Sequence, residues 1–225
     1  MPFRFPAHLY PIVDTLGETG RSHVELAAAI LNGGARLLQL RVKDQPTARF
    51  VEIARAVKAE TDRRGARLLI NDRVDIALLV DAAGVHLGQS DLPVTAARQI
   101  LGPHKIIGIS THNLGQAQAV ASQGAADYLG FGPIYATTSK IRPDPVQGIE
   151  ALRDVRRYVD LPIVAIGGIT AGTMSAVLAA GADAVAMIGA IVRAPDVGAI
   201  VRTLLQQHPS LPPIPELRPR GRKQP

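Results

Sequence analysis

The chain has 225 residues, a net charge of +6 and no cysteine. This length suits one domain with a full hydrophobic core, and the lack of cysteine excludes disulfides, thiolate nucleophiles and cysteine-based zinc sites. No apolar run approaches the length of a membrane span, and the first residues, "MPFRFPAHLYP", lack the apolar core of a signal peptide. We therefore expect a soluble, cytoplasmic protein without a membrane partner.

The positive charge is divided between the C-terminal end and the rest of the chain. The Pro-rich segment 209–225 carries a net charge of +3, and residues 1–208 carry the other +3. A mild excess over 208 residues, with only 4% aromatic residues for base stacking, argues against a nucleic acid partner. It suits an anionic small substrate better. We predict one domain at 1–208 and a disordered basic tail at 209–225.

A helix, a glycine signal and a short apolar strand recur along the chain, as in "AAAILNGGARLLQL" and "VLAAGADAVAMIG". In chain order, the expected strands and their following helices are 8–13 with 22–33, 36–42 with 47–63, 67–71 with 73–82, 84–88 with 93–101, 106–110 with 113–123, 128–132 with 148–159, 162–167 with 172–180, and 184–188 with 195–207. Eight such units predict an α/β protein built as a single (β/α)8 TIM barrel. An open doubly wound sheet is the alternative, but its Gly-rich dinucleotide turn is absent after the first strand.

The stretch "LLQLRVKD" at 37–44 alternates apolar and polar side chains. A strand has a period of two, so its apolar side chains lie on one face and Gln39, Arg41 and Lys43 on the other. In a closed barrel the apolar face should pack under the helices and the polar face should point inward. Charges inside a barrel are costly without an anionic partner, so Arg41 and Lys43 are candidates for binding a diphosphate.

Polar or glycine-rich residues follow seven of the eight expected strands, at the ends where such barrels place their active sites. Besides the residues of 37–44, these are Asn71, Asp72, Asp91, Ser110, the loop 136–148, Gly167–Gly168 and Ile188–Gly189. The loop reads "ATTSKIRPDPVQG", and long irregular loops in compact domains often bind ligands. Thr137 and Ser139 could supply hydroxyl groups, and Lys140 either binds phosphate or is a solvated loop residue.

Asp72 and Asp91 follow neighbouring strands, so their carboxylates could converge. Two carboxylates without nearby histidine or cysteine suit Mg²⁺, which also binds water and substrate phosphates. The alternative is that each aspartate caps the helix that follows it. Their joint placement favours the metal.

Gly167–Gly168 and Ile188–Gly189 follow the last two strands, where many such barrels bind phosphate through backbone N–H groups. Tight turns are the alternative, and the presence of both glycine sites favours phosphate. No residue stands out as a general base. The collection suits a reaction that joins a diphosphate ester to a second phosphorylated substrate, with catalysis by stabilisation of the leaving group.

The ordered set "QLRVK", "INDRVDIALLVDAAGVHLGQSDLP", "IGISTH", "AADYLGFGPIYATTSK", "PIVAIGGIT" and "AVAMIGAI" resembles the thiamine-phosphate synthase family over residues 8–207. The resemblance implies a TIM barrel that couples 4-amino-2-methyl-5-hydroxymethylpyrimidine diphosphate to a thiazole phosphate. The products would be thiamine phosphate and pyrophosphate. It also implies a dissociative mechanism, in which pyrophosphate leaves before the thiazole nitrogen attacks, and this agrees with the missing general base.

The resemblance assigns roles to particular residues. The pyrimidine diphosphate would contact Gln39, Arg41, Lys43, Asn71, Ser110 and Lys140. The thiazole phosphate would contact Thr137, Ser139, Gly168, Ile188 and Gly189. Asp72 and Asp91 match the ligands of the Mg²⁺ cofactor, and the expected catalytic residues are Arg41, Lys43, Ser110 and Lys140.

Two positions depart from the family pattern. Ser139 stands where threonine is usual, which keeps the hydroxyl group. Gly189 stands where serine is common, and losing that hydroxyl could weaken phosphate binding by about 1 kcal/mol.

Two other functions compete with the synthase. A thiazole tautomerase-like relative uses a histidine in the loop after the sixth strand, where this chain has Pro133. A non-catalytic phosphate-binding barrel would not need the charged groups expected around a leaving diphosphate. An oligomer is compatible with the sequence, but its patterns do not indicate an oligomeric state.

Overall fold

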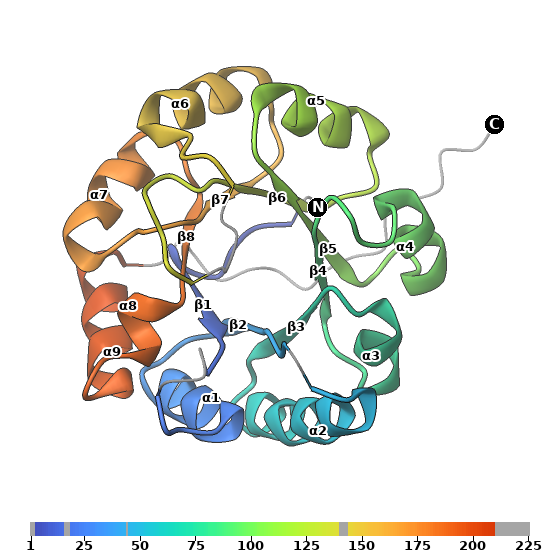
Figure 1. Ribbon diagram of the computed structural model, residues 1–225, viewed down its shortest axis with the longest axis vertical. Helices are drawn as coiled ribbons and strands as arrows, with labels where there is room; N and C mark the ends of the chain where they lie inside the picture. Colours follow the sequence, from blue (N-terminus) through green and yellow to red (C-terminus); the bar gives the residue numbers. More distant parts are fainter. Residues whose placement is uncertain (1–2, 16–18, 44, 140–143, 210–225) are drawn as a thin grey trace.

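The computed structural model describes residues 3–15, 19–43, 45–139 and 144–209, and its strands form one closed parallel barrel in chain order (Figure 1). The strands are β1 (Leu9–Val13), β2 (Leu37–Leu40), β3 (Arg67–Asn71), β4 (Gly84–Leu87), β5 (Ile106–Thr111), β6 (Tyr128–Phe131), β7 (Ile163–Ala165) and β8 (Ala184–Met187). Closure is direct, because β1 pairs in parallel with both β2 and β8. The predicted (β/α)8 barrel is confirmed.

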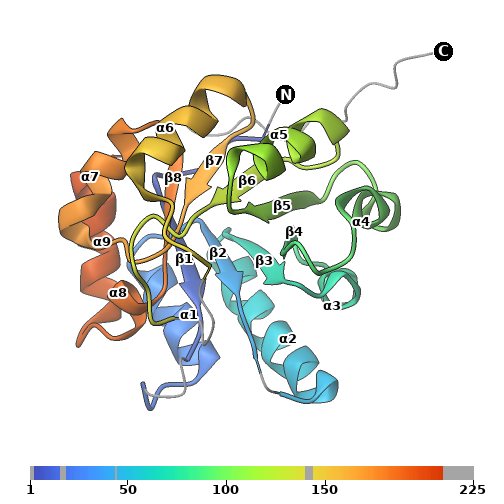
Figure 2. The same ribbon diagram turned by 45° about the horizontal axis from the view of Figure 1, so that its top comes forward.

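The helices surround the barrel on its outside (Figure 2). They are α1 (His23–Asn32), α2 (Thr47–Arg63), α3 (Val74–Leu79), α4 (Val94–Leu101), α5 (Leu114–Gln123), α6 (Gly148–Tyr158), α7 (Ala171–Ala179), α8 (Gly189–Val192) and α9 (Val197–Gln207). Sequence reasoning predicted all of them except α8, a helix of one turn directly after β8. Its four residues are too few to show helical periodicity.

Local capping explains where several helices begin. Ser22 and Glu25 form a capping box at the start of α1, in which each side chain accepts a backbone N–H of the other residue. Asn113 and Asp196 accept backbone N–H groups at the starts of α5 and α9. These short-range signals lie in the sequence itself, which is why the helix starts were predicted to within a few residues.

Two hydrophobic clusters separate the outside of the barrel from its inside. Leu38, Leu40 and Val42 belong to the large cluster between strands and helices. A smaller cluster fills the barrel at its amino-terminal end, where Phe3 and Phe5 pack against Tyr128 with ring centroids 5.5 and 5.0 Å apart. The polar cavity is therefore confined to the opposite end of the barrel.

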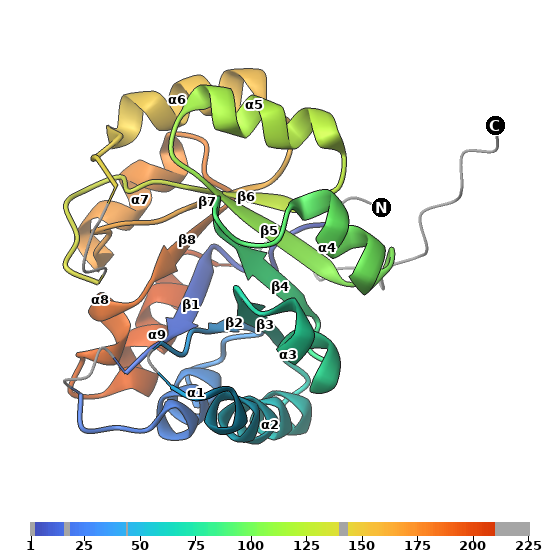
Figure 3. The same cartoon turned by 45° about the vertical axis from the view of Figure 1, so that its right-hand side comes forward.

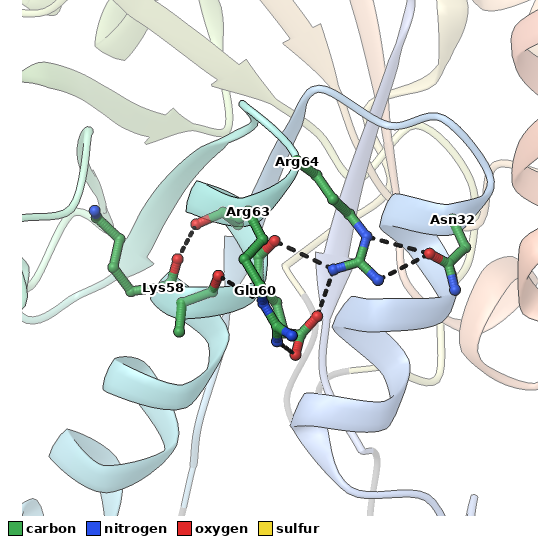
Figure 4. A network of polar contacts seen from close by, with 7 residues as sticks. Asn32, Lys58, Glu60, Arg63 and Arg64 are labelled. Atoms are coloured by element: carbon green, nitrogen blue, oxygen red, sulfur yellow. Dashed lines mark hydrogen bonds and ion pairs between the residues drawn. The ribbon is translucent and has the colours of Figure 1, made fainter.

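Polar contacts tie α1 to α2 where both helices end (Figure 4). Arg64 donates through Nε and Nη2 to Oδ1 of Asn32, at 3.1 and 2.9 Å, and it also forms an ion pair with Glu60. Helices of this fold end at the amino-terminal face of the barrel. We therefore interpret this network as a structural support, since that face contributes to stability in such barrels.

The predicted tail begins at 209, and residues 210–225 lie outside the described residues. In the part of the chain that the structure describes, none of the helices has the length and apolar character needed to span a bilayer.

Candidate active site

A cavity of about 610 Å³ opens at the carboxyl-terminal ends of the strands. Its size is typical of small-molecule sites. Every predicted site residue that the structure describes lines it: Gln39, Arg41, Lys43, Asn71, Asp72, Asp91, Ser110, Thr137, Ser139, Gly168, Ile188 and Gly189. Lys140 lies outside the described residues. The fold thus brings together residues up to 150 positions apart in the sequence.

Ion pairs hold the two basic groups that follow β2. Arg41 donates from Nη1 to Oδ2 of Asp14, the residue directly after β1, and its backbone N–H donates to the Val13 carbonyl at 2.9 Å. Lys43 donates from Nζ to Oδ2 of Asp72 at 2.5 Å. Both cations are therefore positioned at the cavity before any substrate is present.

Neither aspartate of the predicted metal pair caps a helix. Helix α3 follows Arg73, which makes no side-chain cap, and α4 follows Pro93, so the capping alternative is wrong. Asp72 instead adopts a positive φ of 66°, and its backbone N–H donates to the His86 carbonyl at 2.8 Å. Oδ2 of Asp91 accepts the Gly88 N–H at 2.6 Å.

The two carboxylates influence each other. Burial raises the pKa of the Asp91 carboxyl, the Gly88 N–H opposes this shift, and the neighbouring Asp72 carboxylate raises the pKa further. A divalent cation between such groups would offset their repulsion. Among the described residues no set of three or more histidine, cysteine and acidic side chains gathers. Two carboxylates nevertheless fit Mg²⁺, which binds few protein ligands and completes its shell with water and phosphate.

A chain of hydrogen bonds crosses the inside of the barrel beneath the cavity. Gln39 donates from Nε2 to the Tyr10 hydroxyl at 3.0 Å, and the Tyr10 and Tyr128 hydroxyls are 3.0 Å apart. Nδ1 of His86 lies 2.8 Å from the Tyr128 hydroxyl, and its Nε2 lies 2.9 Å from Oγ of Ser110. Five strands contribute to this chain, so Ser110 is connected to the centre of the barrel.

Burial fixes the protonation state of the two tyrosines in this chain. Burial raises the pKa of both tyrosine hydroxyls well above the ordinary value, so both stay protonated. Either hydroxyl can donate in the Tyr10–Tyr128 bond, and the roles of the two His86 nitrogens depend on its tautomer. The His86 ring thus links Oγ of Ser110 to the two buried tyrosines.

Glycines provide the space for these rings. A Cβ on Gly108 would lie 2.0 Å from Cζ of Tyr128, and a Cβ on Gly130 would lie 2.9 Å from Cε1 of His86. Both glycines are on strands, where a side chain would otherwise fill the barrel interior.

The opposite side of the cavity is built from glycine backbone and hydroxyl groups. Gly168 has a φ of 62°, and a Cβ there would lie 2.2 Å from the Ala136 carbonyl oxygen. The Ser139 N–H donates to Oγ1 of Thr137 at 3.2 Å. The loop after β6 also comes close to α8 (Figure 3), because Ser139 lies near Gly189, the first residue of that helix. This arrangement offers N–H and hydroxyl donors to an anion.

The thiamine monophosphate synthase family model matches residues 9–191, which is most of the barrel. The chain belongs to this family. It is 45% identical to the thiamine-phosphate synthase of Chloroflexus aurantiacus over 87% of this chain and 90% of that protein. It is equally identical to the enzyme of Moorella thermoacetica over 87% and 93% of the two chains. The thiamine phosphate pyrophosphorylase structure from Pyrococcus furiosus superposes with a TM-score of 0.79 at 37% identity, covering 89% and 95%.

Family membership confirms the resemblance that the sequence motifs indicated, and the structure adds residues that sequence reasoning missed. Asp14 was not predicted, although it directly follows β1. The search for polar residues at the carboxyl-terminal ends of strands, which found the other site residues, would have included it. Tyr10 and Tyr128 give no signal in the sequence, because nothing local shows that their hydroxyls meet. His86 also belongs to this chain of contacts, since its two ring nitrogens lie close to Tyr128 and Ser110.

Proposed function

We propose that this chain is a Mg²⁺-dependent enzyme that couples 4-amino-2-methyl-5-hydroxymethylpyrimidine diphosphate to thiazole phosphate. The products are thiamine phosphate and pyrophosphate. The observation that carries the proposal is the division of one cavity into two halves. One half holds cations and paired carboxylates, and the other holds glycine backbone and hydroxyl groups, so the cavity suits two different phosphorylated molecules.

The charged half suits the diphosphate. Arg41 and Lys43 bind its oxygens, exchanging part of their contact with Asp14 and Asp72 for the substrate. Bound Mg²⁺, held by Asp72 and Asp91, would supply positive charge that stabilises the departing pyrophosphate. Ser110 offers its hydroxyl group to the pyrimidine substrate, and His86 holds this group in place through Nε2, 2.9 Å from Oγ.

The remaining residues position the second substrate. Backbone and hydroxyl donors around Gly168, Thr137 and Ser139 bind the thiazole phosphate, which does not react. The thiazole nitrogen then attacks the carbon from which pyrophosphate departs, so the new C–N bond replaces the broken C–O bond. The nitrogen has a lone pair and no proton to lose, which is why this chemistry needs no general base. The proposal needs no nucleic acid or membrane partner, and small anionic substrates of this kind suit a cytoplasmic location.

The test is to incubate the protein with both substrates, with and without Mg²⁺, and to measure thiamine phosphate and pyrophosphate. We expect equal amounts of both products, and only when Mg²⁺ is present. Isomerisation of the thiazole phosphate without coupling would contradict the proposal and favour the tautomerase. Binding of the phosphates without any turnover would favour a non-catalytic barrel.

A further inference from the structure

The guanidinium group of Arg193 lies over Gly189 at the edge of the cavity. A Cβ on Gly189 would be 2.9 Å from Nη1 and 3.7 Å from Cζ of Arg193, and 3.7 Å from Oγ of Ser139. Arg193 directly follows α8, and its backbone N–H donates to the Gly189 carbonyl at 3.2 Å. One turn of helix therefore brings this side chain back over the residue at which the helix begins.

Positive charge is distributed unequally around the cavity. Among the described lining residues, the lysines and arginines are Arg41, Lys43 and Arg193. The first two follow β2 and pair with Asp14 and Asp72. Arg193 is on the other side, where its Nη1 and Oγ of Ser139 would both lie within 4 Å of a Cβ on Gly189. A phosphate bound by neutral donors there would leave much of its charge without compensation, whereas a guanidinium matches phosphate oxygens in both charge and geometry.

We propose that Arg193 binds the phosphate of the thiazole substrate, and that Gly189 makes this possible by leaving room for the guanidinium. This inference rests on the proposed function, since it names a binding residue for the second substrate. The glycine at 189 then has a physical explanation. A Cβ there would lie 2.9 Å from Nη1, so the guanidinium would have to shift from its present position.

The first measurement compares steady-state kinetics of Arg193→Gln and Arg193→Lys with the unchanged protein. We expect Arg193→Gln to raise the KM for thiazole phosphate about tenfold or more while the KM for the pyrimidine diphosphate stays the same. Arg193→Lys should raise this KM less than Arg193→Gln does, because lysine keeps the positive charge but lacks the forked geometry of the guanidinium. The matched control is Arg202→Gln, which removes an exposed arginine on α9 that does not line the cavity.

The second measurement tests the link to Gly189 by a double-mutant cycle. Gly189→Ala should raise the KM for thiazole phosphate when Arg193 is present, and should add little in the Arg193→Gln background. Thermal unfolding of each variant shows whether the fold is kept. Simple addition of the two effects would contradict the role given to Gly189.

An unchanged KM for thiazole phosphate in Arg193→Gln would overturn the inference while leaving the proposed function intact. A rise in the KM for the diphosphate instead would also overturn it, since Arg193 would then serve the leaving group. If the unchanged protein makes no thiamine phosphate, the proposed function fails. Titration calorimetry with thiazole phosphate then decides separately whether binding depends on Arg193.

Discussion

The two halves of the cavity are built in different physical ways. At the ends of β1, β2 and β3, full charges face each other in ion pairs, and after β4 burial together with the Asp72 carboxylate raises the pKa of Asp91. At the ends of β6, β7 and β8, close backbone approach at Gly168 and Gly189 determines the shape. The contrast suggests a division of labour, because several charges are most useful where a bond to pyrophosphate breaks, whereas backbone shape together with the Arg193 guanidinium suits a phosphate that does not react.

The largest effect should come from removing charge in the first half. We expect Asp91→Ala to lower turnover about 100-fold or more at limiting Mg²⁺, because one of two proposed metal ligands is lost. The measurement is initial rate against Mg²⁺ concentration, with Asp154→Ala on the exposed surface of α6 as the control. Unchanged activity at limiting Mg²⁺ would show that the metal assignment is wrong.

The second half should respond to a change of shape without any change of charge. Gly168→Ala places a Cβ about 2.2 Å from the Ala136 carbonyl, and we expect it to raise the KM for thiazole phosphate about tenfold and to lower stability. Gly124→Ala is the matched control, because Gly124 has nearly the same φ of 63° but nothing within 4 Å. If both variants behave alike, backbone strain rather than the shape of the site explains the loss.

A smaller effect should follow from loosening Arg41 while keeping its charge. Asp14→Asn removes the carboxylate that holds the guanidinium, and we expect the KM for the pyrimidine diphosphate to rise several-fold, about 1 kcal/mol in binding. The KM for thiazole phosphate should not change. A KM increase for both substrates would mean that the two halves are not independent.

The smallest effect concerns stability near the first half. Burial lowers the pKa of His23 below 6.5, although Asp14 opposes this shift. The unfolded chain therefore binds a proton more readily than the folded one, so stability is lost as the pH falls through about 6.5. His23→Gln should reduce this loss, as measured by denaturant unfolding between about pH 8 and pH 5.5. An identical pH dependence in both proteins would contradict the role of His23.

Local patterns in the sequence predicted the barrel and most of its site. The order of strands and helices depends on short-range periodicity and caps, so it could be predicted from the sequence. The division of residues 38–43 into an outer and an inner face could be predicted in the same way. The polar strand ends could also be read, because every parallel barrel brings those ends to one face. Their chemical roles, including the Mg²⁺ pair, remain predictions that the proposed experiments test.

The sequence by itself determined the architecture, the family and the positions that line the cavity, because these depend on local periodicity and on ordered motifs. Only the tertiary structure decided which side chains meet. The pairing of Asp14 with Arg41, the chain from Gln39 to Ser110 and the position of Arg193 over Gly189 depend on distances between side chains. Barrel closure sets the distances between residues on different strands. The position of Arg193 over Gly189 is set by α8, a helix of one turn that is too short to leave a periodic signal in the sequence.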